Sequence, residues 1–287
     1  MALHTLGELV AILPDRTVGS SAAKEQAKMG DRLAGRTIIV TGGASGIGAG
    51  ICRGLASEGA NAVIADLDLD SAERVADEIT ATGGAAYAVR VDVTDRASVV
   101  AGIEEAVSRH GRLDAYFNNV GMNAPMKFLD ITESNFELVM RVNALGVLIG
   151  IQEAARQFIA QGGGGKVINT ASIAGRQGFA SFAPYSASKA AVISLTQAGA
   201  RALATNGITV NAFAPGVVAT PLWTKLDADL EAMGEGDSGF DSMAAGILLG
   251  RPAQPEDIAP TAIFLAAADS DYITGQVIPI DGGMILV

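Results

Sequence analysis

From residue 36 onward, two kinds of hydrophobic pattern take turns along the chain. Short runs rich in β-branched residues are separated by longer, Ala-rich segments whose apolar residues recur at helical spacing. The runs that predict strands are residues 36–41, 61–66, 85–92, 113–119, 166–172, 208–215 and 276–281. Strands that alternate with helices predict a parallel, doubly wound sheet with helices on both faces. The pattern therefore predicts an α/β protein with a single domain of about seven strands over residues 34–287.

Two segments depart from this pattern. Residues 1–33 contain a short apolar turn followed by a polar, turn-rich stretch, which predicts an N-terminal arm. No basic region precedes the apolar turn, and Glu8 and Asp15 lie within the segment, so a secretory signal is not expected. Residues 221–250 contain no clear strand and follow the carboxyl end of one, which is where ligands bind in open α/β sheets. We therefore predict that 221–250 form a lid over a substrate site.

Composition narrows the class of function. Hydrophobic residues make up 49% of the chain, which fits strands buried on both faces, and no uncharged apolar run reaches the ~18 residues of a membrane span. The net charge of −11 argues against nucleic acid and an anionic membrane surface as partners. One cysteine and two histidines leave little material for disulfides, a metal site or a Ser-His-Asp triad. We expect a cytoplasmic protein with a small-molecule partner and no metal.

A glycine-rich turn follows the first predicted strand. The segment "TGGASGIG" carries Gly42, Gly46 and Gly48 between a β-branched strand and a predicted helix. Glycines let the backbone approach a pyrophosphate, and the helix start offers unpaired N–H groups to it. Such a turn alone is weak evidence and is also found as a mere tight turn. Its position after a strand favours the dinucleotide-binding turn of a Rossmann-type fold.

The second predicted strand ends in a carboxylate that bears on the choice of cofactor. Asp66 follows Gly48 by 18 residues. A carboxylate there accepts hydrogen bonds from the adenosine ribose hydroxyls and repels a 2′-phosphate. No Lys or Arg stands between Gly42 and Gly48 to offset that repulsion, so NAD(H) is favoured over NADP(H). The alternative is that Asp66 merely ends a strand, since Asp68 and Asp70 follow it.

A tyrosine and a lysine stand four positions apart at the start of a predicted helix. Tyr185 and Lys189 therefore share one helical face. An ammonium at ~4 Å and an effective dielectric constant of 20 contributes about 4 kcal/mol before desolvation and screening. Lowering the tyrosine pKa from ~10 by two to three units requires ~3–4 kcal/mol. We expect Lys189 to lower the pKa of Tyr185 so that the phenol acts as a general acid/base without histidine; the alternative is a surface pair.

Six fragments together resemble one family. They are "TGGASGIG" (41–48), "NNVG" (118–121), "VNALG" (142–146), "NTASIAG" (169–175), "YSASK" (185–189) and "PGVVAT" (215–220). In this order they resemble the short-chain dehydrogenase/reductase family over essentially all of residues 34–287. The resemblance implies a nicotinamide-dependent oxidoreductase with Tyr185 as acid/base and Lys189 also holding the nicotinamide ribose. It further implies that Ser172 binds the substrate oxygen and that Asn143 supports a water-mediated proton relay; separately, a strand-end serine and a helix-capping asparagine remain alternatives.

The resemblance also implies a set of cofactor contacts. Asp92 and Val93 match positions that contact adenine, and Val218 and Thr220 match contacts to the nicotinamide amide. Asn118 matches a position that steadies the sheet. The full set of implied cofactor-binding residues is Gly42, Ser45, Gly46, Ile47, Gly48, Asp66, Asp92, Val93, Asn119, Gly121, Tyr185, Lys189, Pro215, Gly216, Val218 and Thr220.

The C-terminal region narrows the substrate. "LWTKLD" and "LGRPAQPEDIAPTAIFLAAADSDYITGQVIPIDGGM" resemble bacterial acetoin/diacetyl reductases (2,3-butanediol dehydrogenases) and neighbouring polyol dehydrogenases. The diol enzymes tend to place amide side chains between Ser172 and the tyrosine, whereas this chain has Ile173 and Phe179. An apolar wall does not offset the desolvation of a hydroxyl, which favours a more hydrophobic alcohol or ketone. Leu222 and Trp223 are predicted either to add to that apolar wall or to pack the lid.

The sequence also bears on two alternative functions and on the oligomeric state. A 3-oxoacyl thioester reductase fits the motifs but usually uses NADPH, which Asp66 disfavours. A non-catalytic NAD-binding protein on the same fold is least favoured because Tyr185 and Lys189 are both retained. The resemblance implies a homotetramer, with the helices around 133–160 and 185–204 at one interface and the C-terminal "MILV" at another.

Overall fold

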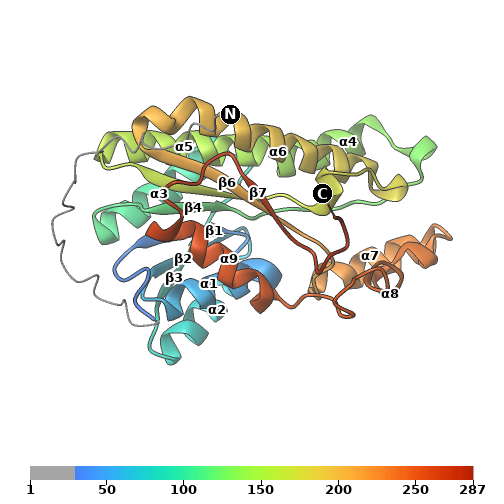
Figure 1. Cartoon of the computed structure of the whole chain (residues 1–287), viewed down its shortest axis with the longest axis horizontal. Coiled ribbons are helices and arrows are strands. Elements are labelled where there is room, and N and C mark those ends of the chain that lie inside the picture. The colour runs from blue at the N-terminus through green and yellow to red at the C-terminus, as the bar shows by residue number, and fades with distance from the viewer. Residues whose placement is uncertain (1–29, 287) are drawn as a thin grey trace, which may run out of the picture.

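Seven parallel strands form one sheet in the computed structural model, which describes residues 30–286 (Figure 1). The strand order is β3-β2-β1-β4-β5-β6-β7, so the chain reverses direction across the sheet after β3. The strands are β1 (Thr37–Thr41), β2 (Asn61–Asp66), β3 (Ala85–Arg90), β4 (Ala115–Asn118), β5 (Gly165–Thr170), β6 (Ile208–Pro215) and β7 (Val277–Ile280). The predicted doubly wound α/β fold is confirmed.

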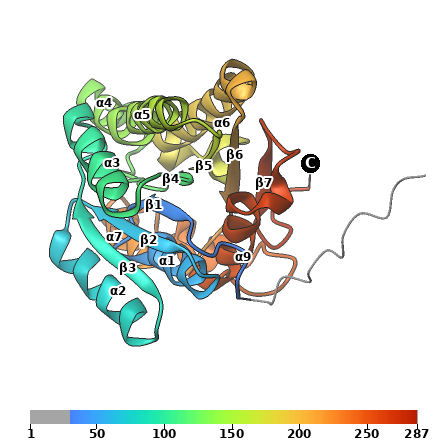
Figure 2. The ribbon, with the colours of Figure 1, turned by 90° about the vertical axis from the view of Figure 1, so that its left-hand side faces the viewer.

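Helices cover both faces of the sheet. Seen along the strands, α1, α2 and α9 lie on one side and α3, α5 and α6 on the other (Figure 2). The α-helices are α1 (Gly46–Ser57), α2 (Leu69–Ala81), α3 (Arg96–His110), α4 (Glu133–Met140), α5 (Gly146–Gln161), α6 (Ala183–Leu203), α7 (Pro221–Ala232), α8 (Phe240–Ala244) and α9 (Pro255–Ala266). Short 3₁₀ turns are η1 (Phe128–Asp130), η3 (Ile173–Gly175), η4 (Ala180–Phe182), η5 (Ala204–Asn206), η6 (Gly236–Ser238) and η7 (Ala268–Ser270).

The core is divided by the sheet into two layers. Along β1, Ile38 and Val40 face the α1 and α9 side, while Ile39 faces the α3 and α5 side. All five residues of β1 are buried, because successive side chains enter opposite layers and both layers are apolar. This two-sided burial explains why the strands read as continuous apolar runs instead of alternating ones.

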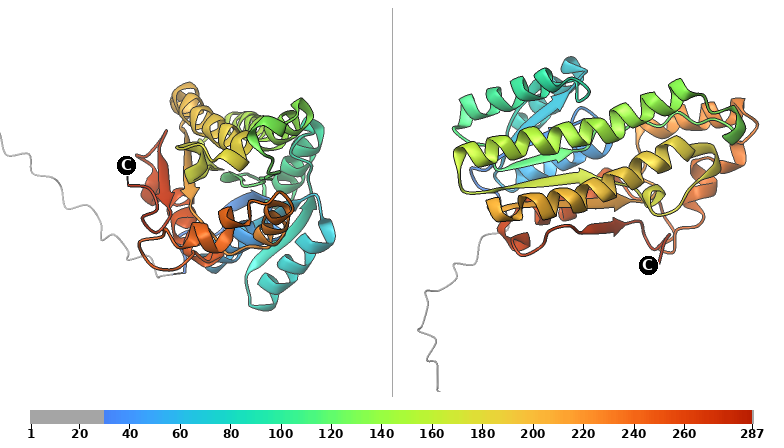
Figure 3. Two further views of the ribbon diagram at one scale, coloured as in Figure 1. Left: turned by 90° about the vertical axis from the view of Figure 1, so that its right-hand side faces the viewer. Right: turned by 90° about the horizontal axis from the view of Figure 1, so that it is seen from above.

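Helices α4 and α5 form one long continuous rod through the π-helical turn η2 (Arg141–Leu145) (Figure 3). The rod, Glu133–Gln161, is long and apolar enough to span a membrane by length and composition. However, 61% of its most apolar 18-residue stretch is buried inside the fold. It packs on β4 and β5 between α3 and α6, as a core helix of an α/β sheet does. The π-helical turn adds one residue to a helical turn, a feature that is frequent at functional sites.

Three details correct or limit the sequence predictions. Leu33, assigned to the arm, is fully buried in the core, so the predicted end of the arm at residue 33 is too late. Residues 1–29 of that arm lie outside the described residues. Residues 221–250, predicted to be free of strands and to form a lid, contain α7, η6 and α8, which lie beyond the carboxyl edge of the sheet (Figures 1 and 3).

Candidate active site

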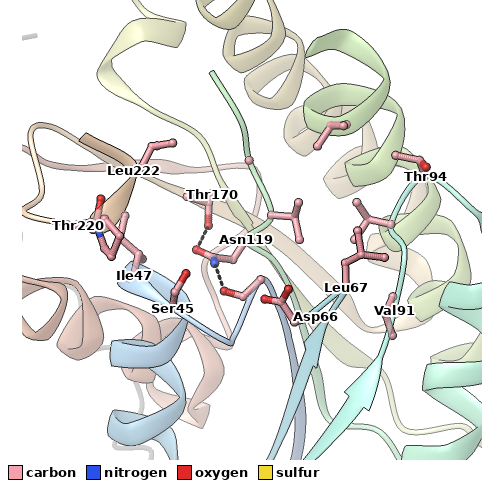
Figure 4. Close-up of a pocket in the computed structure, with 18 of the residues that line it drawn as sticks. Ser45, Ile47, Asp66, Leu67, Val91, Thr94, Asn119, Thr170, Thr220 and Leu222 are labelled. Carbon is pink, nitrogen blue, oxygen red and sulfur yellow. Dashed lines mark hydrogen bonds between the residues drawn. The ribbon is translucent and has the colours of Figure 1, made fainter. Parts of the chain in front are cut away.

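A cleft of about 380 Å³ opens at the carboxyl ends of β1 and β4. Strands β2 and β3 lie on one side of β1 and β4 to β7 on the other, so this is the point at which the strand order reverses. Loops leaving neighbouring strands at such a point diverge to opposite faces and leave a crevice between them. Figure 4 shows side chains from both halves of the sheet facing this crevice.

The glycine-rich turn forms the floor of the cleft. Gly42 and Gly46 have φ values of +67° and +50°, which favour glycine because a Cβ is strained there. A Cβ on Gly48 would stand 2.0 Å from the carbonyl oxygen of Gly42, so only glycine allows α1 to start so close to β1. The Ser45 side chain does not cap α1, and the first N–H groups of the helix are left facing the cleft. This turn fits a pyrophosphate, since it offers backbone donors and no side-chain obstruction.

Carboxylates line the cleft end formed by β2 and β3. Both oxygens of Asp66 accept backbone hydrogen bonds, from Ala44 N at 3.1 Å and from Asp68 N at 3.1 Å, which hold the carboxylate at the cleft wall. Asp92 accepts from the Thr94 N–H at 2.9 Å and from its hydroxyl at 2.8 Å, and these bonds lower the pKa of Asp92. Two acidic side chains therefore stand at the end of the cleft nearest β2 and β3.

Asn119 ties three strand ends together at the centre of the cleft. Its Nδ2 donates to Gly42 O at 3.3 Å, and its Oδ1 accepts from the Thr170 hydroxyl at 3.1 Å (Figure 4). Its neighbour Asn118 is buried instead, and donates to Asn169 Oδ1 at 2.8 Å within the sheet. The two asparagines thus separate into one that lines the cleft and one that steadies β4 against β5.

Tyr185, Lys189 and Ser172 meet at the opposite end of the cleft. Tyr185 and Lys189 project from the first turns of α6, and Ser172 follows β5, where it starts η3. The Tyr185 hydroxyl lies near Ser172, which lowers its pKa, and Tyr185 lines both the cleft and an adjoining cavity. Lys189 is almost fully buried, and its Nζ donates to Thr170 O at 2.7 Å. This arrangement places a phenol, a hydroxyl and an ammonium around one point where cleft and cavity join.

The pKa of Tyr185 differs from the sequence expectation. Burial raises the pKa of Tyr185 above its ordinary value, and the hydrogen bond with Ser172 only partly opposes it. Lys189 Nζ lies 5.6 Å from the centroid of the tyrosine ring and directs its hydrogen bond to Thr170. The expectation that Lys189 lowers the pKa of the Tyr185 phenol is therefore wrong, because desolvation outweighs an ammonium at that distance.

Burial also lowers the pKa of Lys189, from its ordinary 10.5 to about 8. The charged form is then disfavoured in the folded state, so between pH ~8 and ~10.5 the unfolded chain binds more protons than the folded one. We expect the free energy of unfolding of the wild type to rise relative to that of Lys189→Met across this range, by on the order of 2–3 kcal/mol. Below pH ~8 the difference is constant. Urea unfolding of both proteins at several pH values measures this, and a difference that does not change with pH contradicts it.

Asn143 lies in the π-helical turn and is fully buried. Its Nδ2 donates to Met122 O at 2.8 Å and to the Ser188 hydroxyl at 3.0 Å, while its Oδ1 accepts from Met122 N at 2.9 Å. A Cβ on Gly121 would come within 3.3 Å of Lys189 Nζ and 3.8 Å of Asn143 Oδ1. Glycine at 121 therefore leaves room beside the Lys189 ammonium, and Asn143 fixes the backbone of Met122, the residue after this glycine.

The adjoining cavity measures about 110 Å³ and has a mainly apolar wall. All four residues predicted for the substrate pocket line it, namely Ile173, Phe179, Leu222 and Trp223. Trp223 also packs edge-on against Phe240 of α8, with ring centroids 5.5 Å apart. Both alternatives for Trp223, cavity lining and packing within the 221–250 segment, are therefore present together.

The predicted cofactor residues divide between the two spaces. Pro215, Gly216 and Val218 line the cavity and not the cleft, whereas Thr220 lines both. The remaining predicted residues all line the cleft: Gly42, Ser45, Gly46, Ile47, Gly48, Asp66, Asp92, Val93, Asn119, Gly121, Tyr185 and Lys189. Ser172 lines the cavity, and Asn143 lines neither space.

Several lining residues were not singled out from the sequence. In the cleft they include Leu67, Thr94 and Val142, and in the cavity Asn123 and Met243. Leu67 follows directly after Asp66, and Val142 precedes Asn143. Both could therefore have been predicted as lining residues from their position next to a predicted site residue. Asn123 and Met243 lie on loops and a short helix with no local pattern, so only the tertiary structure brings them in.

The cleft fits a nicotinamide dinucleotide by the chemistry of its donors. The glycine turn suits the pyrophosphate, Asp66 can accept from ribose hydroxyls, and Lys189 stands beside the open space at Gly121. The single cysteine takes no part, because Cys52 is buried in α1 and burial raises its pKa to about 12.

Comparisons with known proteins agree with this geometry. A family model described as enoyl-(acyl carrier protein) reductase matches residues 42–285. An L-2,3-butanediol dehydrogenase of Corynebacterium glutamicum is 42% identical over 87% of this chain and 98% of its own length. A sorbitol dehydrogenase of Cereibacter sphaeroides is 41% identical over 88% of this chain and 98% of its own. The crystal structure of a short-chain type dehydrogenase/reductase from Mycobacterium marinum superposes with a TM-score of 0.81 at 35% identity, covering 89% of this chain and 97% of that one. The chain belongs to the short-chain dehydrogenase/reductase family, whose dehydrogenases use a nicotinamide cofactor.

Proposed function

We propose that this enzyme moves a hydride between NAD(H) and a short secondary alcohol or ketone. The observation that carries the proposal is the meeting of Tyr185, Ser172 and Lys189 at the point where the dinucleotide cleft joins a small apolar cavity. When bound, the nicotinamide supplies or accepts the hydride, and its oxidised ring adds a positive charge to the site. The chain itself supplies the proton and binds the substrate oxygen.

In the reducing direction, Tyr185 donates its phenolic proton to the ketone oxygen as the carbonyl carbon gains the hydride. Ser172 donates a hydrogen bond to the same oxygen and stabilises its developing charge. Lys189 stands beside the tyrosine as an ammonium below pH ~8 and favours the phenolate left after proton transfer. In the oxidising direction Tyr185 accepts the alcohol proton instead, so one residue serves both directions.

The role proposed for Asn143 is to shape the relay and not to carry a proton on its side chain. Its amide is occupied by Met122 and Ser188, with contacts at 2.8–3.0 Å. The π-helical turn in which it lies widens the local backbone spacing next to Lys189 and Gly121. A proton returning to Tyr185 through water beside Lys189 would pass along this widened turn.

NAD(H) is proposed over NADP(H) because of charge. Asp66 is fixed at the cleft wall by two backbone N–H groups, and Asp92 is a second carboxylate in the same cleft. Among the described residues that line the cleft, Lys189 is the one cation, and it belongs to the opposite end with Tyr185. A 2′-phosphate at the adenosine end would therefore meet negative charge without a basic residue in the cleft lining.

A small substrate is proposed because of the cavity. Its volume of about 110 Å³ lies below the ~300–1,000 Å³ of pockets that hold drug-sized ligands. Two relatives, an L-2,3-butanediol dehydrogenase and a diacetyl reductase that forms (S)-acetoin, are 42% and 40% identical to this chain. We therefore propose acetoin or diacetyl as the substrate class, and residues 221–250 as the lid that closes over it.

Initial rates with NADH and NADPH against acetoin, diacetyl, acetophenone and an acetoacetyl thioester test the proposal. NADH with acetoin or diacetyl is expected to give the highest kcat/KM. If acetophenone is the best substrate, Ile173 and Phe179 define a hydrophobic-ketone reductase. If the thioester with NADPH is best, both the cofactor and the substrate class proposed here are rejected.

A homotetramer in the cytoplasm is proposed as the setting of this activity. Large apolar side chains stay exposed on the α4–α5 rod, including Phe136, Leu138 and Ile159. Leu286, near the C-terminus, is exposed as well. Several large apolar side chains exposed on one element fit a surface that is covered by another subunit.

A further inference from the structure

The cavity wall holds one side-chain amide that neither the motifs nor the apolar pattern indicated. Asn123 is 7% exposed and lines the cavity together with Ser172 and Tyr185. It does not line the dinucleotide cleft. The hydrogen bonds around it, within residues 30–286, are made by its neighbours Met122 and Ala124, and none of them is made by its own side-chain amide. An amide on a cavity wall that is not used within the fold keeps its donors and its acceptor for a bound ligand.

A structural role for the amide is already filled by other groups. The preceding residue, Met122, is held at both its N–H and its C=O by Asn143. The following residue, Ala124, accepts at its carbonyl from Asn135 Nδ2 at 3.2 Å, and Met126 N donates to Ser181 O at 3.1 Å. The segment around Asn123 is therefore fixed on both sides without help from its own side chain.

We propose that Asn123 binds a second oxygen of the substrate and so selects short ketones with an adjacent hydroxyl or keto group. The reacting oxygen is taken by Ser172 and Tyr185, and the remaining wall is largely apolar. In a cavity of about 110 Å³, a second oxygen on a neighbouring carbon stays close to the reacting one and needs a polar partner inside the same space. An amide can donate to a keto oxygen and both donate to and accept from a hydroxyl, so one residue serves diketone, ketol and diol.

The apolar neighbours of Asn123 in the cavity wall favour a different kind of substrate. Ile173 and Phe179 are apolar residues of the cavity wall, and alone they favour a hydrophobic substrate. Asn123 supplies an amide from a different loop, after β4, to the same cavity. The inference rests on the proposed ketone reductase function.

The test compares two substrates that share a four-carbon skeleton, acetoin and 2-butanone, with saturating NADH. Wild-type enzyme is expected to prefer acetoin, because a site built to bind a substrate hydroxyl discriminates against the analogue that lacks it. Asn123→Leu is expected to lower kcat/KM for acetoin by about 10- to 100-fold and to leave 2-butanone within about threefold. Asn123→Ser, which puts a smaller polar group, a hydroxyl, in place of the amide, is expected to recover part of the acetoin rate.

The matched control is Asn135→Ala, which loosens the same segment but does not line the cavity. It is expected to change both substrates by the same factor. The inference is overturned if Asn123→Leu lowers both substrates equally, or if it leaves acetoin unchanged. A wild-type enzyme that reduces neither substrate with NADH or NADPH rejects the proposed function itself, which is a different result from the loss of discrimination alone.

Discussion

Replacing Tyr185 with phenylalanine is expected to lower kcat for acetoin reduction by about 10³-fold while NADH still binds. The hydroxyl is the group that lies with Ser172 at the junction of cleft and cavity. Phenylalanine fills the same volume, so α6 and the cleft wall stay in place. Steady-state rates, together with NADH binding followed by fluorescence, measure the two effects separately.

The control for this substitution is Tyr272→Phe, which removes the hydroxyl of a fully exposed tyrosine. It is expected to leave both kcat and NADH binding unchanged. If Tyr185→Phe keeps more than about a tenth of the wild-type kcat, another group passes the proton and the proposed role of Tyr185 is wrong.

The second large effect is expected at the opposite end of the cleft. Asp66→Asn is expected to lower the preference for NADH over NADPH, expressed as the ratio of their kcat/KM values, by about 10²-fold. A unit charge at ~4 Å contributes about 4 kcal/mol at an effective dielectric constant of 20, and screening leaves part of it. Asparagine keeps one of the two acceptor positions that now hold Ala44 N and Asp68 N, so the loop is largely preserved.

Asp70→Asn is the matched control, because it removes the same charge from an exposed position in the first turn of α2 that does not line the cleft. The cofactor ratio is expected to stay within about twofold, since an exposed charge at that distance is largely screened. Equal shifts for Asp66→Asn and Asp70→Asn would attribute cofactor choice to net charge and remove the specific role of Asp66.

The two ends of the site differ in how their charge is controlled. At the adenosine end, hydrogen bonds from the Thr94 N–H and hydroxyl lower the pKa of Asp92 and so favour its ionised form. At the reacting end burial disfavours charge, which raises the pKa of Tyr185 and lowers that of Lys189. A neutral tyrosine and a protonated lysine at pH 7 suit proton donation to a ketone. Oxidation of an alcohol is therefore expected to be favoured at higher pH than reduction.

The sequence by itself determined the strands, the glycine turn and the family. Most of the strands are local apolar runs, so β2 and β6 agree with their predicted bounds and the other strands differ by at most a few residues at an end. Gly42 and Gly48 can be predicted from the sequence because a positive φ and a close backbone approach each require glycine within a short segment. The pairing of Tyr185 with Lys189 can be predicted because helical spacing alone puts them on one face.

The tertiary structure decided what depends on contacts between distant segments. The order of the strands places the cleft between β1 and β4, and no local pattern states that order. Burial set the pKa of Tyr185 against the sequence expectation, since desolvation depends on everything packed around the phenol. Asn123 entered the substrate cavity from a loop without any local signal, because three contacts to other elements fix that loop in place. Local sequence determines which groups are available, whereas burial and the approach of distant loops determine which of them face the substrate.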